Sequence, residues 1–178
     1  MSLHPGAPAP AFELPDTAGA SHRVDGTGAA GGPTVVVFTC NHCPYALAWH
    51  DRLMEVAADY ADRDVRMLAV NSNDAERYPR DSFEAMRERV QADGGWPAPY
   101  LHDATQEVAS AYGARTTPDV FVVDAGGTLA YRGAPDADHQ DPSLGAAWLR
   151  EALDALLASE PVTRAETEPV GCSIKWRP

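Results

Sequence analysis

The sequence has few cysteines, few basic residues and no long apolar run. Only 14 lysines and arginines stand against 26 aspartates and glutamates in its 178 residues, which gives a formal net charge of −12. Such an acidic chain is a poor match for nucleic acid or for an anionic membrane surface. No segment approaches the roughly 20 apolar residues that a membrane-spanning helix needs. We therefore expect neither nucleic acid nor a membrane among its partners.

The N-terminal residues also lack the features of a secretory signal. They are rich in proline, glycine and alanine, without a basic start followed by an apolar stretch. This pattern predicts a cytoplasmic protein. Its three cysteines, Cys40, Cys43 and Cys172, are an odd number and make a poor disulfide framework. In a reducing compartment, a close cysteine pair is more often catalytic or metal-binding than structural.

The length and the 44% hydrophobic content suit one ordinary core. We expect a single domain over residues 1–178. Residues 1–33 contain many prolines and glycines, which interrupt helices and strands, so we expect them to form an N-terminal extension. Residues 160–178 have no helical period and read as a C-terminal tail that packs on the domain.

The pattern between these segments predicts an α/β fold. Residues 34–38 form a continuous β-branched and aromatic run, typical of a central strand buried on both faces. A strand–helix–strand start implies a parallel pair of strands, and a late hairpin adds antiparallel ones. We therefore expect a mixed sheet with helices on both faces. The other expected elements are helices at about 44–62, 82–90, 105–112 and 143–158, and strands at 65–70, 120–123 and 129–132.

Cys40 and Cys43 flank the junction between the first buried strand and the first helix. A helix N-terminus offers unpaired N–H groups and a partial positive charge, which stabilise a thiolate. The thiolate is the nucleophile in disulfide exchange. We expect Cys40 to attack, because the earlier residue of such a turn is usually the more exposed. Cys43 would then resolve the mixed disulfide.

His42 lies between the two cysteines. A partly protonated imidazole would favour the thiolate and make the couple more oxidising than a thioredoxin with Gly-Pro at these positions. The alternative is that His42 only caps the helix or points to water.

The dipeptide Thr117-Pro118 opens the late strand at 120–123. An X-Pro bond is the usual site of a cis peptide, and a proline is tolerated at the start of a strand. Alone, this signal is weak. It gains meaning from the Cys-x-x-Cys unit that ends about 75 residues earlier.

Several motifs together resemble a known family. The run Phe38-Thr39-Cys40-Asn41-His42-Cys43-Pro44, followed by Thr117-Pro118, resembles the thioredoxin-like superfamily. More narrowly, the chain resembles its redoxin branch, the alkyl hydroperoxide reductase/thiol-specific antioxidant-like proteins. Residues 6–14 match that branch's G-x-x-A-P-x-F-x-L pattern. Residues 78–83, 105–109 and 171–176 look like a small bacterial subfamily of thioredoxin-like proteins.

The resemblance implies a three-layer α/β/α sandwich and a redox-active disulfide that needs no metal or organic cofactor. It implies a cis peptide at Thr117-Pro118, close to Cys40, where the Thr117 backbone would pair with a peptide or thiol substrate. Thr39, Asn41, His42 and Pro44 would tune the site. Expected partners are protein or small-molecule thiols and disulfides, and a thioredoxin or glutathione system as reductant. The subfamily often has a cysteine before its Thr-Pro pair, but this chain has Thr116.

Thiol–disulfide exchange is the preferred function, with a thiol-dependent peroxidase as an alternative. Peroxiredoxins typically have a P-x-x-x-T-x-x-C pattern, and counting back from Cys43 puts Cys40 itself at the threonine position. Pro33 and Thr39 do not restore the pattern from either cysteine. A non-catalytic binding module and a metal site also stay open. Such a metal site would use Cys40, His42 and Cys43, completed by His50 or His102.

Two further features leave their roles open. Cys172 is either a third redox thiol, brought to Cys40 when the tail folds back, or an inert apolar residue of a packed tail. Residues 71–74, which follow the second strand, either line the site near Cys40 or form a polar turn.

Overall fold

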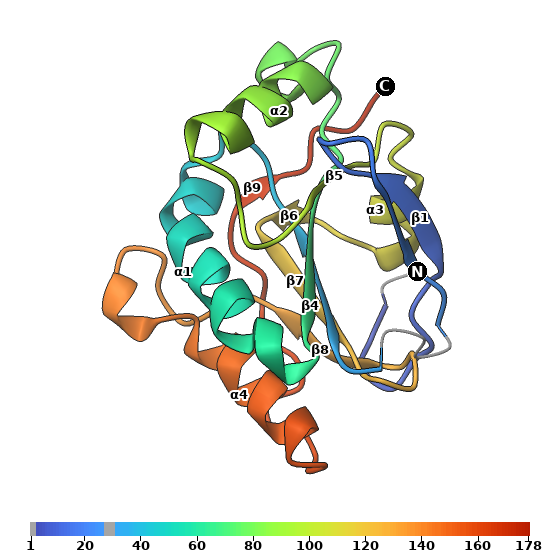
Figure 1. Ribbon diagram of the computed structural model, residues 1–178, viewed down its shortest axis with the longest axis vertical. Helices are drawn as coiled ribbons and strands as arrows, with labels where there is room; N and C mark the ends of the chain where they lie inside the picture. Colours follow the sequence, from blue (N-terminus) through green and yellow to red (C-terminus); the bar gives the residue numbers. More distant parts are fainter. Residues whose placement is uncertain (1–2, 27–30) are drawn as a thin grey trace.

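A five-stranded mixed sheet forms the centre of the protein, seen in a computed structural model that describes residues 3–26 and 31–178 (Figure 1). The strand order is β5-β4-β3-β7-β8. β3 pairs in parallel with β4, and β4 with β5, whereas β7 and β8 are antiparallel additions. The strands are β3 (Thr34–Phe38), β4 (Arg66–Asn71), β5 (Tyr100–His102), β7 (Asp119–Val123) and β8 (Leu129–Gly133).

The expected mixed sheet is therefore confirmed, with one strand added. β5 was not predicted because it has only three residues and directly follows Pro97 and Pro99. Three residues are too few to show an alternating pattern. The strand exists because Ala69, Val70 and Asn71 of β4 provide a parallel partner.

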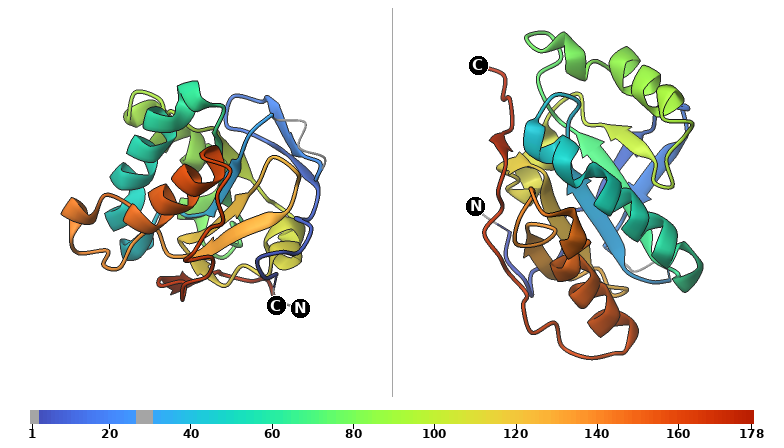
Figure 2. Two further views of the ribbon diagram at one scale, coloured as in Figure 1. Left: turned by 90° about the horizontal axis from the view of Figure 1, so that it is seen from below. Right: turned by 90° about the vertical axis from the view of Figure 1, so that its left-hand side faces the viewer.

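Helices cover both faces of the sheet, as predicted, and the side chains of β3 alternate between them (Figure 2). Val35 and Val37 face one cluster with α1 and α4, while Val36 and Phe38 face a second cluster with α3 and the β1–β2 hairpin. The covering elements are α1 (Pro44–Tyr60), α4 (Ala147–Leu157), α3 (Glu107–Tyr112), β1 (Phe12–Pro15) and β2 (Ser21–Val24).

α2 (Phe83–Ala92) covers the β5 edge, where Met86 is fully buried against Ala69 and Tyr100. Its N-cap is Ser82, whose hydroxyl accepts the backbone N–H of Ala85 at 3.2 Å. Because Ser82 takes this role, the carboxylate of Asp81 is free to point elsewhere.

The last helix starts later than predicted. A 3-10 turn, Pro142–Leu144, precedes it, and Gly145 adopts a φ of +60°. That left-handed residue interrupts the helical pattern, so α4 begins at Ala147 rather than near residue 143.

Both terminal segments pack on this framework. The described part of the N-terminal extension forms the antiparallel β1–β2 pair, while residues 1–2 and 27–30 lie outside the described residues. The C-terminal tail includes β9 (Cys172–Ser173), which pairs antiparallel with β6 (Thr116–Thr117) just before Pro118. Figure 1 shows the tail passing beside the end of α1 that is nearest to α2.

A buried ion pair ties α1 to the loop after β8. Arg52 Nη1 lies 2.9 Å from Asp136 Oδ2, and both side chains are almost completely inaccessible to solvent. Asp136 also accepts Trp49 Nε1–H at 2.8 Å and the Ala146 backbone N–H at 2.9 Å. The pair therefore connects two elements that form the α1–α4 side of the core.

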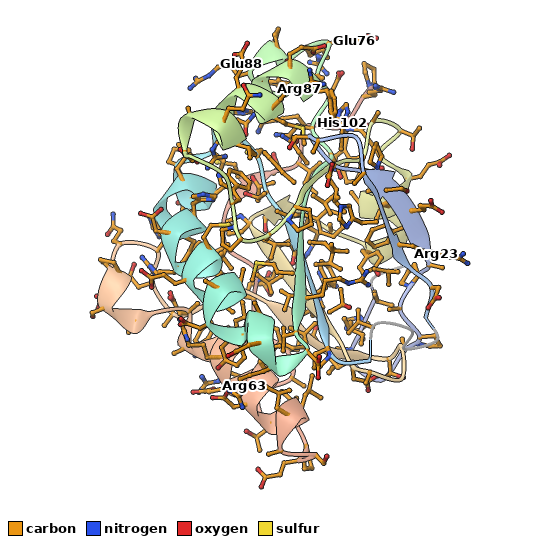
Figure 3. All side chains as sticks on the ribbon, viewed as in Figure 1. Arg23, Arg63, Glu76, Arg87, Glu88 and His102 are labelled. Atoms are coloured by element: carbon orange, nitrogen blue, oxygen red, sulfur yellow. The ribbon has the colours of Figure 1, made fainter. Side chains whose placement is uncertain are left out.

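The surface is charged, as the composition suggests. Side chains such as Arg23, Glu76 and Glu88 point away from the molecule (Figure 3). Among the described residues, no helix combines the length and the apolar character that crossing a membrane requires.

Candidate active site

The two cysteines lie where a strand gives way to a helix. The Thr39 backbone N–H donates to Val70 O at 2.8 Å and carries the sheet pairing one residue beyond β3. Cys43 is the N-cap of α1, and Pro44 occupies its first position, where a missing N–H costs nothing. Both cysteines are free thiols. This is the placement that the sequence predicted.

Their accessibility differs from the prediction. Cys40 is 1% exposed and Cys43 is fully buried, so Cys40 has no clear advantage in exposure. The expectation rested on the local turn alone, which would leave the earlier cysteine open. Residues distant in sequence cover it, among them Cys172 of the tail, which packs against the cluster that contains both cysteines.

The Thr117–Pro118 peptide bond is cis, and Thr117 contacts both sulfurs. Cys43 Sγ donates to Thr117 O at 3.1 Å, and Cys40 Sγ lies 3.4 Å from Thr117 Oγ1. The fold therefore unites the two motifs that the sequence holds far apart. Thr117 is 2% exposed, so these contacts are made away from water.

A hydrogen bond between the two sulfurs shifts their pKa values in opposite directions. The pKa of Cys43 is lowered to about 4, chiefly because Cys40 donates a hydrogen bond to its sulfur, with further help from Cys172 and the backbone of Ala46. The pKa of Cys40 is raised for the same reason, and burial and the negative charge of Asp81 raise it further. The reduced pair therefore holds one proton and one negative charge, which is the reactive state for disulfide exchange.

Asp81 is a site residue that the sequence did not reveal. It is fully buried, and its Oδ1 accepts the Asn41 backbone N–H at 2.7 Å and Asn71 Nδ2–H at 3.1 Å. Its Oδ2 accepts Asn73 Nδ2–H at 3.0 Å and lies 2.5 Å from His42 Nδ1. The carboxylate thus fixes the backbone between the cysteines. The polar residues after β4 line the site through Asp81 and do not merely form a turn.

His42 is held between Asp81 and the ring of Tyr78. The two rings are stacked, with centroids 5.8 Å apart and an interplanar angle of 6°. A nitrogen of His42, a carboxylate oxygen of Asp81 and the Cys40 sulfur all lie within 4.8 Å of one another. The ring therefore lies close to the Cys40 sulfur, although its side chain stays 19% exposed.

This arrangement bears on the hypothesis of a metal site. Among the described residues, Cys40, His42 and Asp81 have ligand atoms within 4.8 Å of one another, so Asp81 stands where the sequence suggested a second histidine. His50 packs on Trp96 and His102 on Phe83, and neither joins the group formed by Cys40, His42 and Asp81. The site therefore does not have the ligand set that the sequence suggested for a metal.

Asn41 fixes the turn from the outside. Its Oδ1 accepts the hydroxyl of Tyr100 at 2.8 Å and Arg89 Nη1–H at 3.1 Å, and its Nδ2 donates to Arg80 O at 2.8 Å. Arg89 Nη1 also donates to Cys40 O at 3.1 Å. Tyr100, a buried residue of β5, therefore also supports the site.

Replacing His42 by alanine is expected to make the pair more reducing. The Asp81 carboxylate already raises the pKa of Cys40, and removing the ring takes away the imidazole nitrogen that lies 2.5 Å from this carboxylate. We expect the pH midpoint of thiol alkylation to rise by about one unit and the potential to fall by about 30 mV. Iodoacetamide kinetics and equilibration with glutathione measure the two quantities. His102→Ala is the control, and an unchanged midpoint in His42→Ala would contradict the prediction.

Cys172 reaches the site from the tail, with Cys43 as its hydrogen-bond partner. The sequence suggested Cys40 as the partner of a third thiol, whereas the sulfur of Cys172 interacts with that of Cys43. Burial and the charge on Cys43 raise the pKa of Cys172 to about 11, so it is protonated at neutral pH while the pair is reduced.

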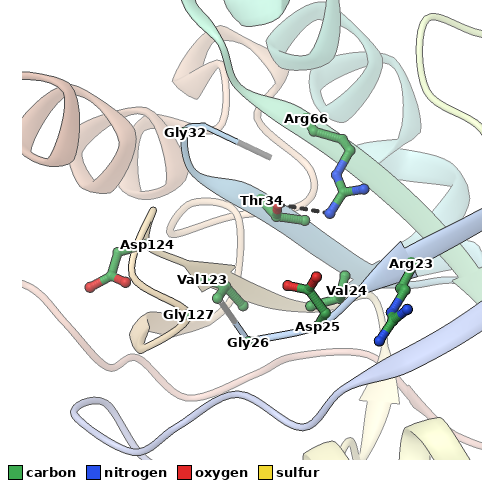
Figure 4. A pocket seen from close by; sticks show the side chains of 10 residues that line it. All are labelled: Arg23, Val24, Asp25, Gly26, Gly32, Thr34, Arg66, Val123, Asp124 and Gly127. Carbon is green, nitrogen blue, oxygen red and sulfur yellow. Dashed lines mark hydrogen bonds between the residues drawn. The ribbon is translucent and has the colours of Figure 1, made fainter. Parts of the chain in front are cut away.

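A separate pocket lies at the opposite end of β3. It measures about 270 Å³ and is lined by Thr34 and Arg66 together with Arg23, Asp25 and Asp124. Arg66 Nη2 donates to Thr34 Oγ1 at 3.3 Å (Figure 4). Thr34 begins β3, whereas Cys40 follows its last residue, so this pocket is not part of the thiol site.

Comparisons with known proteins agree with the fold. Residues 5–132 match the model of the AhpC/TSA family. A solved, uncharacterized conserved protein from Geobacillus kaustophilus is 40% identical over 99% of this chain and 94% of that one, with a TM-score of 0.89. A hypothetical protein from Sinorhizobium meliloti 1021 is 36% identical over 99% and 97%, with a TM-score of 0.88.

A more distant likeness shows the fold alone. The thioredoxin domain of a thiol-disulfide oxidoreductase from Bacteroides vulgatus is 18% identical over 80% of this chain and 96% of that one, with a TM-score of 0.62. No curated protein matches the chain. The similarity to the thioredoxin-like superfamily, and to its redoxin branch, is thus confirmed.

Proposed function

Since this chain belongs to the AhpC/TSA family and has a thioredoxin-like fold, we propose that it is a thiol–disulfide oxidoreductase centred on Cys40 and Cys43. The family and the fold support a thiol redox function. The observation that favours disulfide exchange is the placement of both sulfurs against Thr117 at the N-terminus of α1, and the opposite pKa shifts of the two thiols agree with it. A pair with one charge and one proton is prepared for two successive thiol–disulfide exchanges.

In the first step, the sulfur of Cys40 attacks one sulfur of the substrate disulfide. For this step Cys40 passes its proton to Cys43 and becomes the thiolate, and the substrate reaches it by displacing the partly exposed ring of His42. The substrate S–S bond breaks, a Cys40–substrate S–S bond forms, and one substrate thiolate leaves and takes up a proton.

In the second step, the thiolate of Cys43 attacks Cys40. The mixed disulfide breaks, the Cys40–Cys43 disulfide forms, and the second substrate thiol is released. In total the pair loses two electrons and its one proton to the substrate, and the second proton that the two released thiols need comes from water. A thioredoxin or glutathione system would return the electrons. The cycle needs no metal or organic cofactor, and a cytoplasmic location would keep the pair reduced.

Cys172 fits the role of a third, slower thiol. Its raised pKa makes it a weak nucleophile in the reduced protein. Once Cys40 and Cys43 are joined, the charge on Cys43 is gone, and Cys172 can exchange onto Cys43 and release Cys40. Mass spectrometry of the gently oxidised protein tests this role. If Cys40–Cys43 is the only bridge that forms, Cys172 acts as a packing residue.

The proposed function is tested in a single turnover. The reduced protein, freed of reductant, is mixed with 2-hydroxyethyl disulfide, then quenched and mapped by mass spectrometry. We expect one Cys40–Cys43 bridge and two released thiols for each chain. A pair that stays reduced, or product that forms equally well in Cys40→Ser, would overturn the proposal.

A thiol-dependent peroxidase is the second candidate, favoured by one observation. The sequence lacks the expected threonine before the cysteine, but the hydroxyl of Thr117 lies 3.4 Å from Cys40 Sγ. That hydroxyl could contact a peroxide bound to the sulfur. Oxidation of the reduced pair by hydrogen peroxide, compared with oxidation by the disulfide, separates the two. A peroxide rate that exceeds the disulfide rate and drops in Thr117→Val would favour the peroxidase.

A further inference from the structure

The protein's own tail occupies the backbone edge beside the thiols. Thr117 contacts both sulfurs, so an extended peptide that brought a disulfide to Cys40 would lie along β6. Peptides bind to such an edge by adding a strand. Here that strand is already present, because Thr116 pairs with Ser173 and Thr117 pairs with Cys172. The residue of the tail that faces the reactive pair is itself a cysteine.

The tail approaches this edge very closely at Gly171. A Cβ atom at this position would lie 2.2 Å from Thr117 O and 2.7 Å from the carbonyl carbon. Both are backbone atoms, so no side-chain movement can relieve the overlap. The residue must be glycine for β9 to lie against β6 in the observed way, which makes the sequence of the tail specific for this contact.

Contacts after Cys172 fasten the tail on its other side. Ile174 is 3% exposed and packs into the cluster around β3 and α3, and its N–H donates to Arg115 O at 3.1 Å. Lys175 donates its N–H to Asn73 Oδ1 at 2.9 Å and accepts the Asp74 N–H at 2.8 Å and Gln106 Nε2–H at 2.9 Å. Removing the tail from β6 requires these bonds to break together.

The side chains of His42 and Tyr78 lie near Cys40 away from the tail. His42 lies within 4.8 Å of the sulfur and stacks on Tyr78, and both side chains are partly exposed. Turning the His42 ring aside breaks its contact with Asp81 and one ring stack, whereas moving β9 breaks its pairing with β6 and the hydrogen bonds of Lys175. A small molecule therefore needs a much smaller movement than a peptide does.

We infer that the site acts on low-molecular-weight disulfides and excludes disulfides held in polypeptides, because the β9 strand occupies the place of a substrate peptide. This inference rests on the proposed function and specifies its substrate class. It also differs from the expectation that the Thr117 backbone is open to a protein substrate. If the tail is displaced in about 1% of molecules, peptides react about 100-fold more slowly than the open edge would allow.

The test compares two substrates with one readout. The reduced protein is mixed with 2-hydroxyethyl disulfide or with insulin, and formation of the Cys40–Cys43 disulfide is followed by alkylation and mass spectrometry. Gly171→Ala pushes the tail away from Thr117 O. Gly32→Ala is the matched control, since its Cβ would lie 2.1 Å from Asp64 O, a backbone clash outside the thiol site. Ile174→Ala loosens the tail without a clash, and it replaces Gly171→Ala in the test if Gly171→Ala does not fold.

We expect the wild type to react with the small disulfide at least about 100-fold faster than with insulin. In Gly171→Ala or Ile174→Ala this ratio should fall at least about tenfold, and in Gly32→Ala it should stay as in the wild type. Equal wild-type rates with the two substrates, or a ratio that neither tail variant changes, would overturn the inference. If neither substrate oxidises the pair in any variant, the proposed function itself fails.

Discussion

Replacing Cys40 by serine is expected to lower the single-turnover rate with a small disulfide by at least about a thousandfold. A serine hydroxyl is not appreciably ionised at neutral pH and cannot form the mixed disulfide. Cys43 keeps its place at the N-terminus of α1, but it loses the hydrogen bond from Cys40 that contributes most to its lowered pKa. Stopped-flow release of the substrate thiol measures the loss.

The Cys43→Ser variant separates the two roles. Cys40 can still attack, so the first substrate thiol should be released, but the second exchange has no nucleophile. We expect a stable adduct between Cys40 and half of the substrate, visible as a mass increase on the peptide that contains Cys40. An adduct on Cys43 in Cys40→Ser, with none on Cys40 in Cys43→Ser, would reverse the assignment. Cys172→Ser is the control and should still complete the turnover.

The local part of this site could be predicted from the sequence. The buried strand at 34–38 and the helix after Pro44 each have a clear pattern within a few residues, and they position Cys40 and Cys43 between them. The position of Thr117 beside the sulfurs came from a resemblance, because nothing local in the sequence determines it. The structure provides the physical reason: β7, which follows Pro118, is the antiparallel neighbour of β3.

Asp81 could not be identified in the same way. In the sequence it is a good helix N-cap, and an aspartate before a helix usually needs no other explanation. Its role depends on Asn71 and Asn73, which come from the end of another strand and supply the donors that make a buried carboxylate tolerable. The only signal in the sequence was the polar run after β4, in a position where parallel sheets gather their functional groups.

The tail strand was hidden for a different reason. β9 has two residues and no hydrophobic period, so a pattern cannot reveal it. Its stability comes from tertiary contacts of its neighbours, above all the buried side chain of Ile174. Gly171 and Ile174, which flank Cys172, nevertheless indicate that the tail packs on the domain in one defined way. This path changes the expected substrate class, which the thiol motif alone does not determine.

Replacing Asp136 by alanine is expected to lower the free energy of unfolding by about 3–5 kcal/mol. The change leaves the guanidinium of Arg52, whose side chain is 4% exposed, without its counter-charge inside the protein. Trp49 Nε1–H and the Ala146 N–H lose their acceptor as well. A typical domain has only about 5–15 kcal/mol of stability, so the variant should unfold at a much lower urea concentration.

The expected loss is large because Arg52 would remain as a buried charge without a partner, and a double variant tests this explanation. In Arg52→Leu/Asp136→Leu no unpaired charge remains, so part of the lost stability should return. Full recovery is not expected, because Trp49 Nε1–H still lacks its acceptor. Glu168→Ala is the matched control: it removes an exposed partner of Arg115 and should cost less than about 1 kcal/mol. A loss of less than about 1 kcal/mol in Asp136→Ala would show that the Arg52 charge is solvated. A double variant that is no more stable than Asp136→Ala would show that Asp136 connects α1 to the loop after β8 as a hydrogen-bond acceptor rather than through its charge.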